Sequence, residues 1–157
     1  MGILRLSSLP SEKWRMSSGK ALNFSGQWDD IRKRILARDR NTCAFCGFSS
    51  PKFMEVHHLR GWEEEREKDL VTVCPLCHRC FHIGFAGMNR KGSLLILKEE
   101  SGVDQEYINR LLLDTVANYG TAGCFAELRK SLSVIKDLGP DGLVVAANEL
   151  LRISSGG

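Results

Sequence analysis

Two cysteine pairs, each with a two-residue gap, constrain the fold of this chain more than any other feature. They are Cys43-x2-Cys46 and Cys74-x2-Cys77, and 27 residues lie between them. A two-residue gap lets both thiolates of a pair reach one ion, and two such pairs complete a tetrahedral zinc site. The sequence therefore predicts one structural Zn2+ on these four cysteines, with His78 or Cys80 as the alternative ligand.

Cysteine usage and the lack of long apolar segments limit the compartment in which this chain works. Its six cysteines could form disulfides, but C-x2-C pairs without a secretory apolar segment favour metal binding in a reducing compartment. The sequence holds no run of about 18 apolar residues, so we expect no membrane insertion. These features predict a cytoplasmic protein.

Basic residues are concentrated ahead of the cysteine pairs. The chain has a net charge of +3, and residues 1–42 contain nine Lys or Arg against four Asp or Glu. Arg32, Lys33 and Arg34, followed by Arg38 and Arg40, would form an electrostatic footprint if they met phosphate. The same residues would also suit the solvated face of a helix, so charge alone leaves both interpretations open.

Hydrophobic spacing predicts a mixed α+β set of elements around the cysteines. Apolar residues at three- and four-residue steps (Trp28, Ile31 and Ile35) place a helix over 27–39. The other expected elements are an N-terminal hairpin before residue 18, strands at 53–57, 70–73 and 93–97, and a helix from 77–82 that Gly84 and Gly87 cut short. Gly47 should permit the tight turn that follows the first cysteine pair.

The remaining residues predict helices. Ser101 with Asp104 forms a capping-box pattern at the start of one helix, and Pro140 suits the first turn of another. A further helix is expected over 122–137, where Cys124 should be a small buried hydrophobic residue. These segments carry no catalytic pattern. Their apolar residues therefore predict either part of the hydrophobic core or a surface that binds a partner. We therefore predict an α+β module over 1–98, a helical extension over 99–153 and a disordered tail over 154–157.

The order of cysteines and histidines resembles the HNH endonuclease, or ββα-metal, superfamily. The residues that carry the resemblance are Cys43-x2-Cys46, His57-His58, Asp69-Leu70-Val71 and Cys74-x2-Cys77-His78-x3-His82. The resemblance implies an HNH-like ββα zinc module in which His57 and His82 hold a second divalent metal, Mg2+ or Mn2+. It also implies that His58 is the general base of phosphodiester hydrolysis and that Asp69 stands where the family has an orienting Asn. One candidate function is therefore a nuclease that binds nucleic acid.

A second resemblance covers more of the chain, roughly residues 3–113. It rests mainly on Arg38-Asp39-Arg40-x-Thr42-Cys43-x-Phe45-Cys46-Gly47-Phe48, on Leu70-Val71-Thr72-x-Cys74-x2-Cys77-x2-Cys80-Phe81, and on Gly92-Ser93-Leu94-x-Ile96-x2-Glu99. These motifs resemble the IcmJ/DotN family, the HNH-derived zinc subunit of type IVB secretion coupling complexes. The resemblance implies an accessory or scaffold subunit that binds the C-terminal region of a VirD4-like coupling ATPase and other coupling-complex subunits. It further implies that the protein reaches the inner membrane through these partners.

Two features favour the scaffold over the nuclease. The run Glu63-Glu64-Glu65-Arg66-Glu67 is net negative where a phosphate backbone would approach. Asp69 in place of Asn changes the charge and the hydrogen-bond donors beside His58. We therefore expect a zinc-stabilised scaffold without metal-dependent DNA cleavage. A partner segment is expected to add to the strand over 93–97, whose edge would be open.

Overall fold

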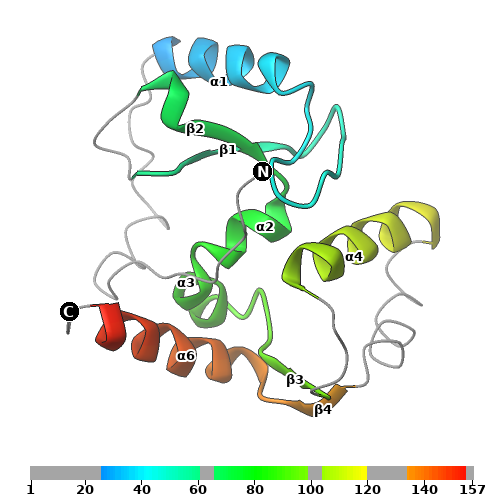
Figure 1. Cartoon of the computed structure of the whole chain (residues 1–157), viewed down its shortest axis with the longest axis vertical. Helices are drawn as coiled ribbons and strands as arrows, with labels where there is room; N and C mark the ends of the chain where they lie inside the picture. The colour runs from blue at the N-terminus through cyan, green and yellow to red at the C-terminus, as the bar shows by residue number, and fades with distance from the viewer. Residues whose placement is uncertain (1–25, 61–65, 99–103, 120–133, 155–157) are drawn as a thin grey trace.

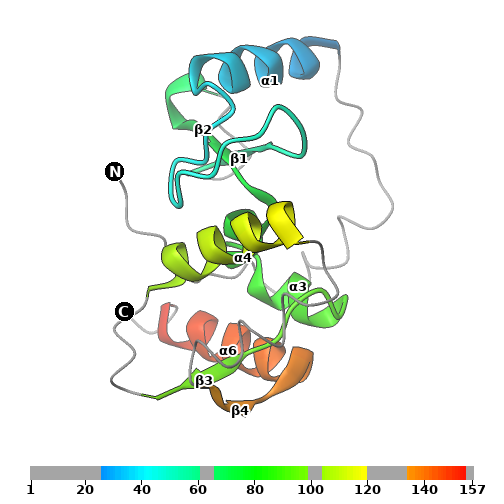
Figure 2. The ribbon, with the colours of Figure 1, turned by 90° about the vertical axis from the view of Figure 1, so that its right-hand side faces the viewer.

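The computed structural model is a mixed α+β fold built around two small antiparallel sheets, which agrees with the predicted class. It describes residues 26–60, 66–98, 104–119 and 134–154. The predicted N-terminal hairpin, Cys124, the acidic residues 63–65 and residues 155–157 of the predicted tail lie outside the described residues. Ser154, predicted as the first residue of that tail, is instead the last residue of a helix. In both views α1 (Gly26–Arg38) lies at one end of the molecule and α6 (Gly139–Ser154) at the other (Figure 1 and Figure 2).

Helix α1 docks on the first sheet through the apolar stripe that the sequence predicts. Ile31 and Ile35 are 6% and 1% exposed and pack against Leu70, with Trp28 and Val56 partly buried beside them. Burial of side chains of this size stabilises a fold by about 1.5–3 kcal/mol each. The stripe therefore holds α1 on the first sheet, and Figure 1 shows the helix beside β2 (Leu70–Val73).

The first sheet consists of β1 (Glu55–His58) and β2 (Leu70–Val73), which pair antiparallel, and a 3-10 turn, η3 (Glu67–Asp69), leads into β2. The bounds of β2 are those predicted, whereas β1 begins two residues later than expected. Successive side chains of a strand point to opposite faces. Accordingly Val56 and His58 contact α1, whereas Glu55 and His57 contact the residues that follow β2.

Two arginines of the basic cluster fasten α1 to this sheet. Arg32 donates to the Met54 carbonyl at 2.8 Å, just before β1. Arg38 donates to the Leu70 carbonyl of β2 at 2.7 Å. Hydrogen bonds from a charged donor are stronger than those between neutral groups. These contacts give the two side chains a role inside the fold that needs no phosphate partner.

Two short helices, α2 (Pro75–Cys80) and α3 (Ile83–Met88), follow β2. The prediction that Gly84 and Gly87 end a helix was wrong, because both glycines lie inside α3. At Gly87 a side-chain Cβ would lie 2.7 Å from the Pro140 carbonyl oxygen of α6. The missing side chain therefore lets α3 and α6 approach closely.

The second sheet pairs β3 (Leu95–Leu97) with β4 (Val134–Asp137). The predicted helix over 122–137 was therefore wrong at its end, where the chain forms a strand. Val134 and Ile135 are β-branched, which favours a strand, and pairing with β3 satisfies backbone groups of the segment. One edge of β3 is thus covered by the chain itself and is not available to a partner peptide.

Helix α6 begins at Gly139, with Pro140 in its first turn as predicted. Gly139 has a φ of +64°, a left-handed conformation that glycine adopts without strain. The apolar side of α6 packs on α3, where Leu143 and Ala147 form a second core with Ile83. Figure 2 shows α3 and α6 as neighbouring helices.

Helix α4 (Gln105–Tyr119) contacts α2 and is capped by Asp104, whose Oδ1 accepts a hydrogen bond from the Tyr107 N–H at 2.7 Å. The predicted capping partner, Ser101, lies outside the described residues. Among the described segments, the helices are too short or too polar to cross a lipid bilayer.

The bond between Thr72 and Asp39 gives a test of how the first sheet is held. Thr72 is fully buried, and its backbone N–H donates to Asp39 Oδ2 at 2.9 Å. Asp39→Ala should leave this N–H unsatisfied and lower the free energy of unfolding by about 1–3 kcal/mol in chemical denaturation. Asp39→Asn keeps an acceptor oxygen and serves as the control, with a smaller loss. Unchanged stability in Asp39→Ala would contradict this role.

Candidate metal centre

The first cysteine pair lies on a tight loop that its own backbone stabilises. The Gly47 N–H donates to the Cys43 carbonyl at 3.1 Å, and the Cys43 N–H donates to the Phe48 carbonyl at 2.8 Å. Gly47 has a φ of +69°, so the residue that the sequence assigns to the turn adopts the left-handed conformation that favours glycine. The loop brings Cys43 and Cys46 to the same cluster of sulfurs.

The second pair lies at the start of α2. Cys74 is the N-cap residue, and its Sγ accepts a hydrogen bond from the Cys77 backbone N–H at 3.3 Å. Pro75 occupies the first turn of the helix, where its missing N–H needs no partner. This capping arrangement fixes both sulfurs at the same end of α2.

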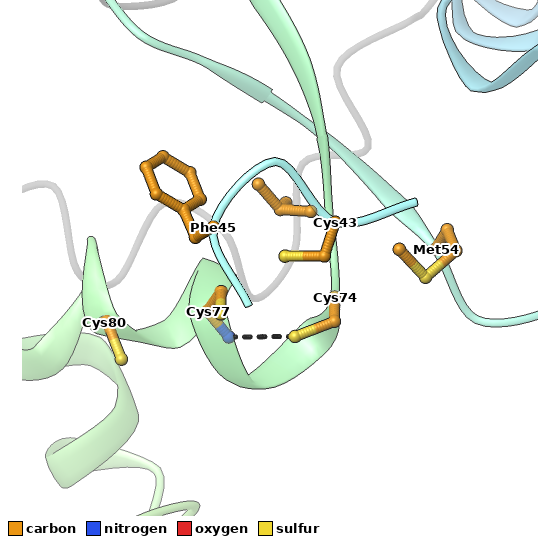
Figure 3. Close-up of a cluster of buried hydrophobic side chains, with 7 residues drawn as sticks. Cys43, Phe45, Met54, Cys74, Cys77 and Cys80 are labelled. Atoms are coloured by element: carbon orange, nitrogen blue, oxygen red, sulfur yellow. Dashed lines mark hydrogen bonds between the residues drawn. The ribbon is translucent and has the colours of Figure 1, made fainter. Parts of the chain in front are cut away.

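The two pairs meet in one cluster. The Sγ atoms of Cys43, Cys46, Cys74 and Cys77 lie within 4.8 Å of one another, and those of Cys46 and Cys74 are 3.7 Å apart. All four are free cysteines, three of them buried and Cys46 partly buried. Figure 3 shows Cys43, Cys74 and Cys77 converging between Phe45 and Met54. Four cysteines at this spacing can hold a metal such as zinc.

The electrostatics of the four thiols also fits a bound cation. Hydrogen bonds from Cys46, Cys74 and Cys77 lower the pKa of Cys43 far below the usual thiol range. Hydrogen bonds with Cys43 and Cys46 instead raise the pKa of Cys77. Four thiolates this close would repel one another in a buried site, and a divalent cation removes that repulsion. The donor set therefore suits a metal that prefers sulfur.

The two alternative ligands lie elsewhere. Cys80 is outside the group of four, and its Sγ donates to the Leu76 carbonyl at 3.4 Å. Figure 3 shows Cys80 farther along the chain than Cys77, apart from Cys43 and Cys74. His78 belongs to a second group of possible ligands. The structure thus brings together the four cysteines that the spacing singles out.

The second group consists of His57, His78 and His82, which each place one ring nitrogen within 4.8 Å of the others. They come from β1, from α2 and from the residue before α3. The ring of His57 stacks on Phe81, with the ring centroids 4.2 Å apart. The HNH resemblance implies that His57 and His82 hold a metal, and the structure places His78 beside them.

Burial keeps two of these histidines in the form that binds metals. Burial, with the charges of His78 and His82, lowers the pKa of His57 to about 3. Burial and His78 likewise lower the pKa of His82 to about 4. Among the described residues, His82 Nδ1 is buried without a hydrogen-bond partner. Neutral imidazoles suit Zn2+, Ni2+ or Cu2+, whereas Mg2+ prefers oxygen ligands.

Glu55 orients one of the three histidines. Its Oε2 bonds to Nδ1 of His78, and this contact holds the pKa of the Glu55 carboxyl below its usual value. A carboxylate on one ring nitrogen fixes the tautomer and leaves the other nitrogen for a metal. Sequence reasoning missed these roles of Glu55 and His78. The spacing His78-x3-His82 could have suggested the role of His78, because residues four apart lie on the same side of a helix.

His58 and Asp69 lie apart from the three histidines. His58 faces α1, where its ring stacks on Trp28 with the centroids 5.1 Å apart. Asp69 directs its carboxylate to two arginines: Oδ2 accepts from Arg66 at 2.8 Å, and Oδ1 pairs with Arg60 at 3.3 Å. The structure therefore places the predicted base on the opposite face of β1 from the histidine group. It places the predicted orienting residue beside arginines.

The lowered pKa of His57 predicts how stability depends on pH. Because an unfolded histidine titrates near pH 6.5, the unfolded chain gains this proton first as the pH falls. The free energy of unfolding should be fully retained above about pH 6.5 and should fall toward pH 4, by up to about 3 kcal/mol from His57 alone. His57→Gln should show a shallower fall in denaturation curves recorded between about pH 7 and pH 4. Parallel pH profiles for the two proteins would contradict this prediction.

Comparison with known proteins identifies a relative of this chain. The chain is 28% identical over 118 residues to the type 4 apparatus protein DotN of Legionella pneumophila subsp. pneumophila, a match that covers 73% of the chain. The match covers 54% of DotN, so the chain spans about half the length of this relative. No family model matches the chain. The match to DotN confirms the resemblance to the IcmJ/DotN family that the sequence motifs carry.

Proposed function

We propose that this protein is a zinc-stabilised accessory subunit of a type IV secretion coupling complex. The observation that carries the proposal is the similarity to DotN over 73% of the chain. The zinc part is supported by the four cysteines, whose sulfurs lie within 4.8 Å of one another. Four thiolates would fill all positions of a tetrahedral ion, which is typical of structural rather than catalytic zinc. The ion would thus hold the fold together.

The partner we propose is the C-terminal segment of a VirD4-like coupling ATPase, with other subunits of the coupling complex. Through these partners the protein would work at the cytoplasmic side of the inner membrane. The binding surfaces we favour are β3 and the first turn of α4. Ile96 on β3 is 43% exposed and Tyr107 in the first turn of α4 is 54% exposed. Because β4 covers one edge of β3, the segment would bind through apolar side chains there.

Co-purification tests this proposal. The full chain, loaded with zinc, should form a stable complex with the C-terminal segment of the coupling ATPase from the same bacterium in size-exclusion chromatography. Ile96→Asp should weaken binding at least about tenfold, because a charge would enter an apolar contact. Phe53→Asp is the matched control, since Phe53 is also exposed (78%) but precedes β1.

The controls separate two ways in which the proposal could fail. If wild type binds and Ile96→Asp binds equally well, the interface lies elsewhere on the protein. If the wild-type chain binds no segment of the ATPase, the secretion role is wrong.

The histidine group supports a second candidate, an HNH endonuclease. In that case His57 and His82, joined by His78, would hold the catalytic metal, and His58 would be the general base. Two observations weigh against it. The ring of His58 stacks on Trp28, on the face of β1 opposite His57. The carboxylate of Asp69, which would orient the base, pairs with arginines.

A plasmid-nicking assay decides between the two candidates. We expect no cleavage of supercoiled DNA with Mg2+, Mn2+ or Zn2+. A general base contributes roughly 10²–10⁴-fold to a rate, so cleavage that His58→Ala reduces by such a factor would establish the nuclease. His78→Ala is the companion variant, because it removes a metal ligand and leaves His58 in place.

A further inference from the structure

Asn109 is a buried polar side chain in the second turn of α4. It is 4% exposed, and its Nδ2 lies 3.2 Å from Cys77 Sγ and 3.6 Å from Cys80 Sγ. Cys77 belongs to the four-cysteine cluster, whereas Cys80 does not. The amide of α4 therefore joins a candidate metal ligand to the neighbouring sulfur.

The hydrogen-bond network fixes which end of this amide faces the sulfurs. Asn109 Oδ1 accepts a hydrogen bond from Gln105 Nε2 at 2.9 Å, one turn earlier on α4. The amide oxygen is thus occupied within its own helix, and the two N–H donors point to Cys77 and Cys80. A sulfur is a weak acceptor as a thiol and a much better one as a thiolate. The arrangement suits Cys77 in the deprotonated form that binds a metal.

We propose that Asn109 is a positioning residue that couples metal binding at the four cysteines to the docking of α4. The proposal rests on the proposed function in one respect, since it requires that these cysteines hold a metal. When Cys77 is a metal-bound thiolate, the bond from Asn109 is charge-assisted and holds α4 against α2. Coupling between two equilibria is reciprocal. If the docked position of α4 increases the affinity for the metal, metal binding therefore stabilises that docked position by the same free energy.

The surroundings of α4 show why this bond matters. Leu113, one turn after Asn109, packs on the core that surrounds the four cysteines. Asn109 and Leu113 thus lie on the same side of α4 and contact the same region, one by a polar bond and one by apolar packing. Cys80 gains a role as well: its thiol donates to the Leu76 carbonyl, which leaves its lone pairs to accept from Asn109.

Metal titration of the full chain tests the coupling. Zn2+ affinity would be measured against a competing chelator, and Co2+ would replace Zn2+ as a spectroscopic probe. Asn109→Leu keeps the size of the side chain and removes the donor. Loss of a hydrogen-bond partner of a metal ligand typically lowers affinity about 10–100-fold, and we expect a loss in that range. The sulfur-to-cobalt charge-transfer band should also shift, because Cys77 loses a hydrogen bond.

The matched control is Leu113→Ala, which weakens the packing of α4 and removes no hydrogen bond to a sulfur. It should leave the cobalt band at its wild-type position. A second readout uses the wild-type chain alone: amide hydrogen exchange in α4 should speed up when the metal is removed by a chelator. Wild-type affinity and an unshifted band in Asn109→Leu would overturn the coupling.

The outcomes also separate this proposal from the function on which it rests. If the wild-type chain binds neither Zn2+ nor Co2+, the zinc part of the proposed function is wrong, and the coupling falls with it. If wild type binds tightly but chelation leaves hydrogen exchange in α4 unchanged, the coupling alone is wrong.

Discussion

The candidate metal centre depends on four cysteine sulfurs, which two segments distant in the sequence bring within 4.8 Å of one another. The first pair sits on a loop that Gly47 allows to turn, and the second pair caps α2. Among the described residues, Cys43, Cys74 and Cys77 belong to the largest buried cluster, together with Phe45, Met54 and Val73, and Cys46 packs against it. Such a small module has little apolar surface to bury, and structural zinc can supply about 10–16 kcal/mol of apparent binding free energy in peptides. A metal at this point would therefore organise the loop, the sheet and α2 together.

The histidine group depends on the same framework. Cys77 and His78 are consecutive residues of α2, so a helix that places the first sulfur also sets the direction of the imidazole beside it. His57 reaches that imidazole because strand alternation turns it toward α2, and the same alternation turns His58 toward α1. The geometry thus places the predicted base, His58, and the predicted metal ligand His57 on different faces of β1.

Local patterns predicted much of this structure, and long-range packing decided the rest. The cysteine spacing, the stripe of α1, the bounds of β2, the turn at Gly47 and the start of α6 follow from short-range chemistry, and all agree with the structure. The strand β4 does not follow from short-range chemistry. The apolar spacing before residue 137 is that of a helix, and the segment forms a strand because it pairs with β3. Gly87 was likewise predicted to end a helix, because no sequence pattern shows that its missing side chain makes room for Pro140. No sequence pattern could have joined Asn109 to Cys77, 32 residues away.

The central claim is that the four cysteines hold one structural zinc ion. X-ray absorption at the zinc edge, on protein that holds one zinc ion per chain, measures the ligands of that ion directly. The account predicts a first shell of four sulfurs at about 2.3 Å. A first shell dominated by nitrogen at about 2.0–2.1 Å would place the ion on the histidines instead. A chain that folds fully after all zinc has been removed would contradict the claim that the cysteine centre organises the fold.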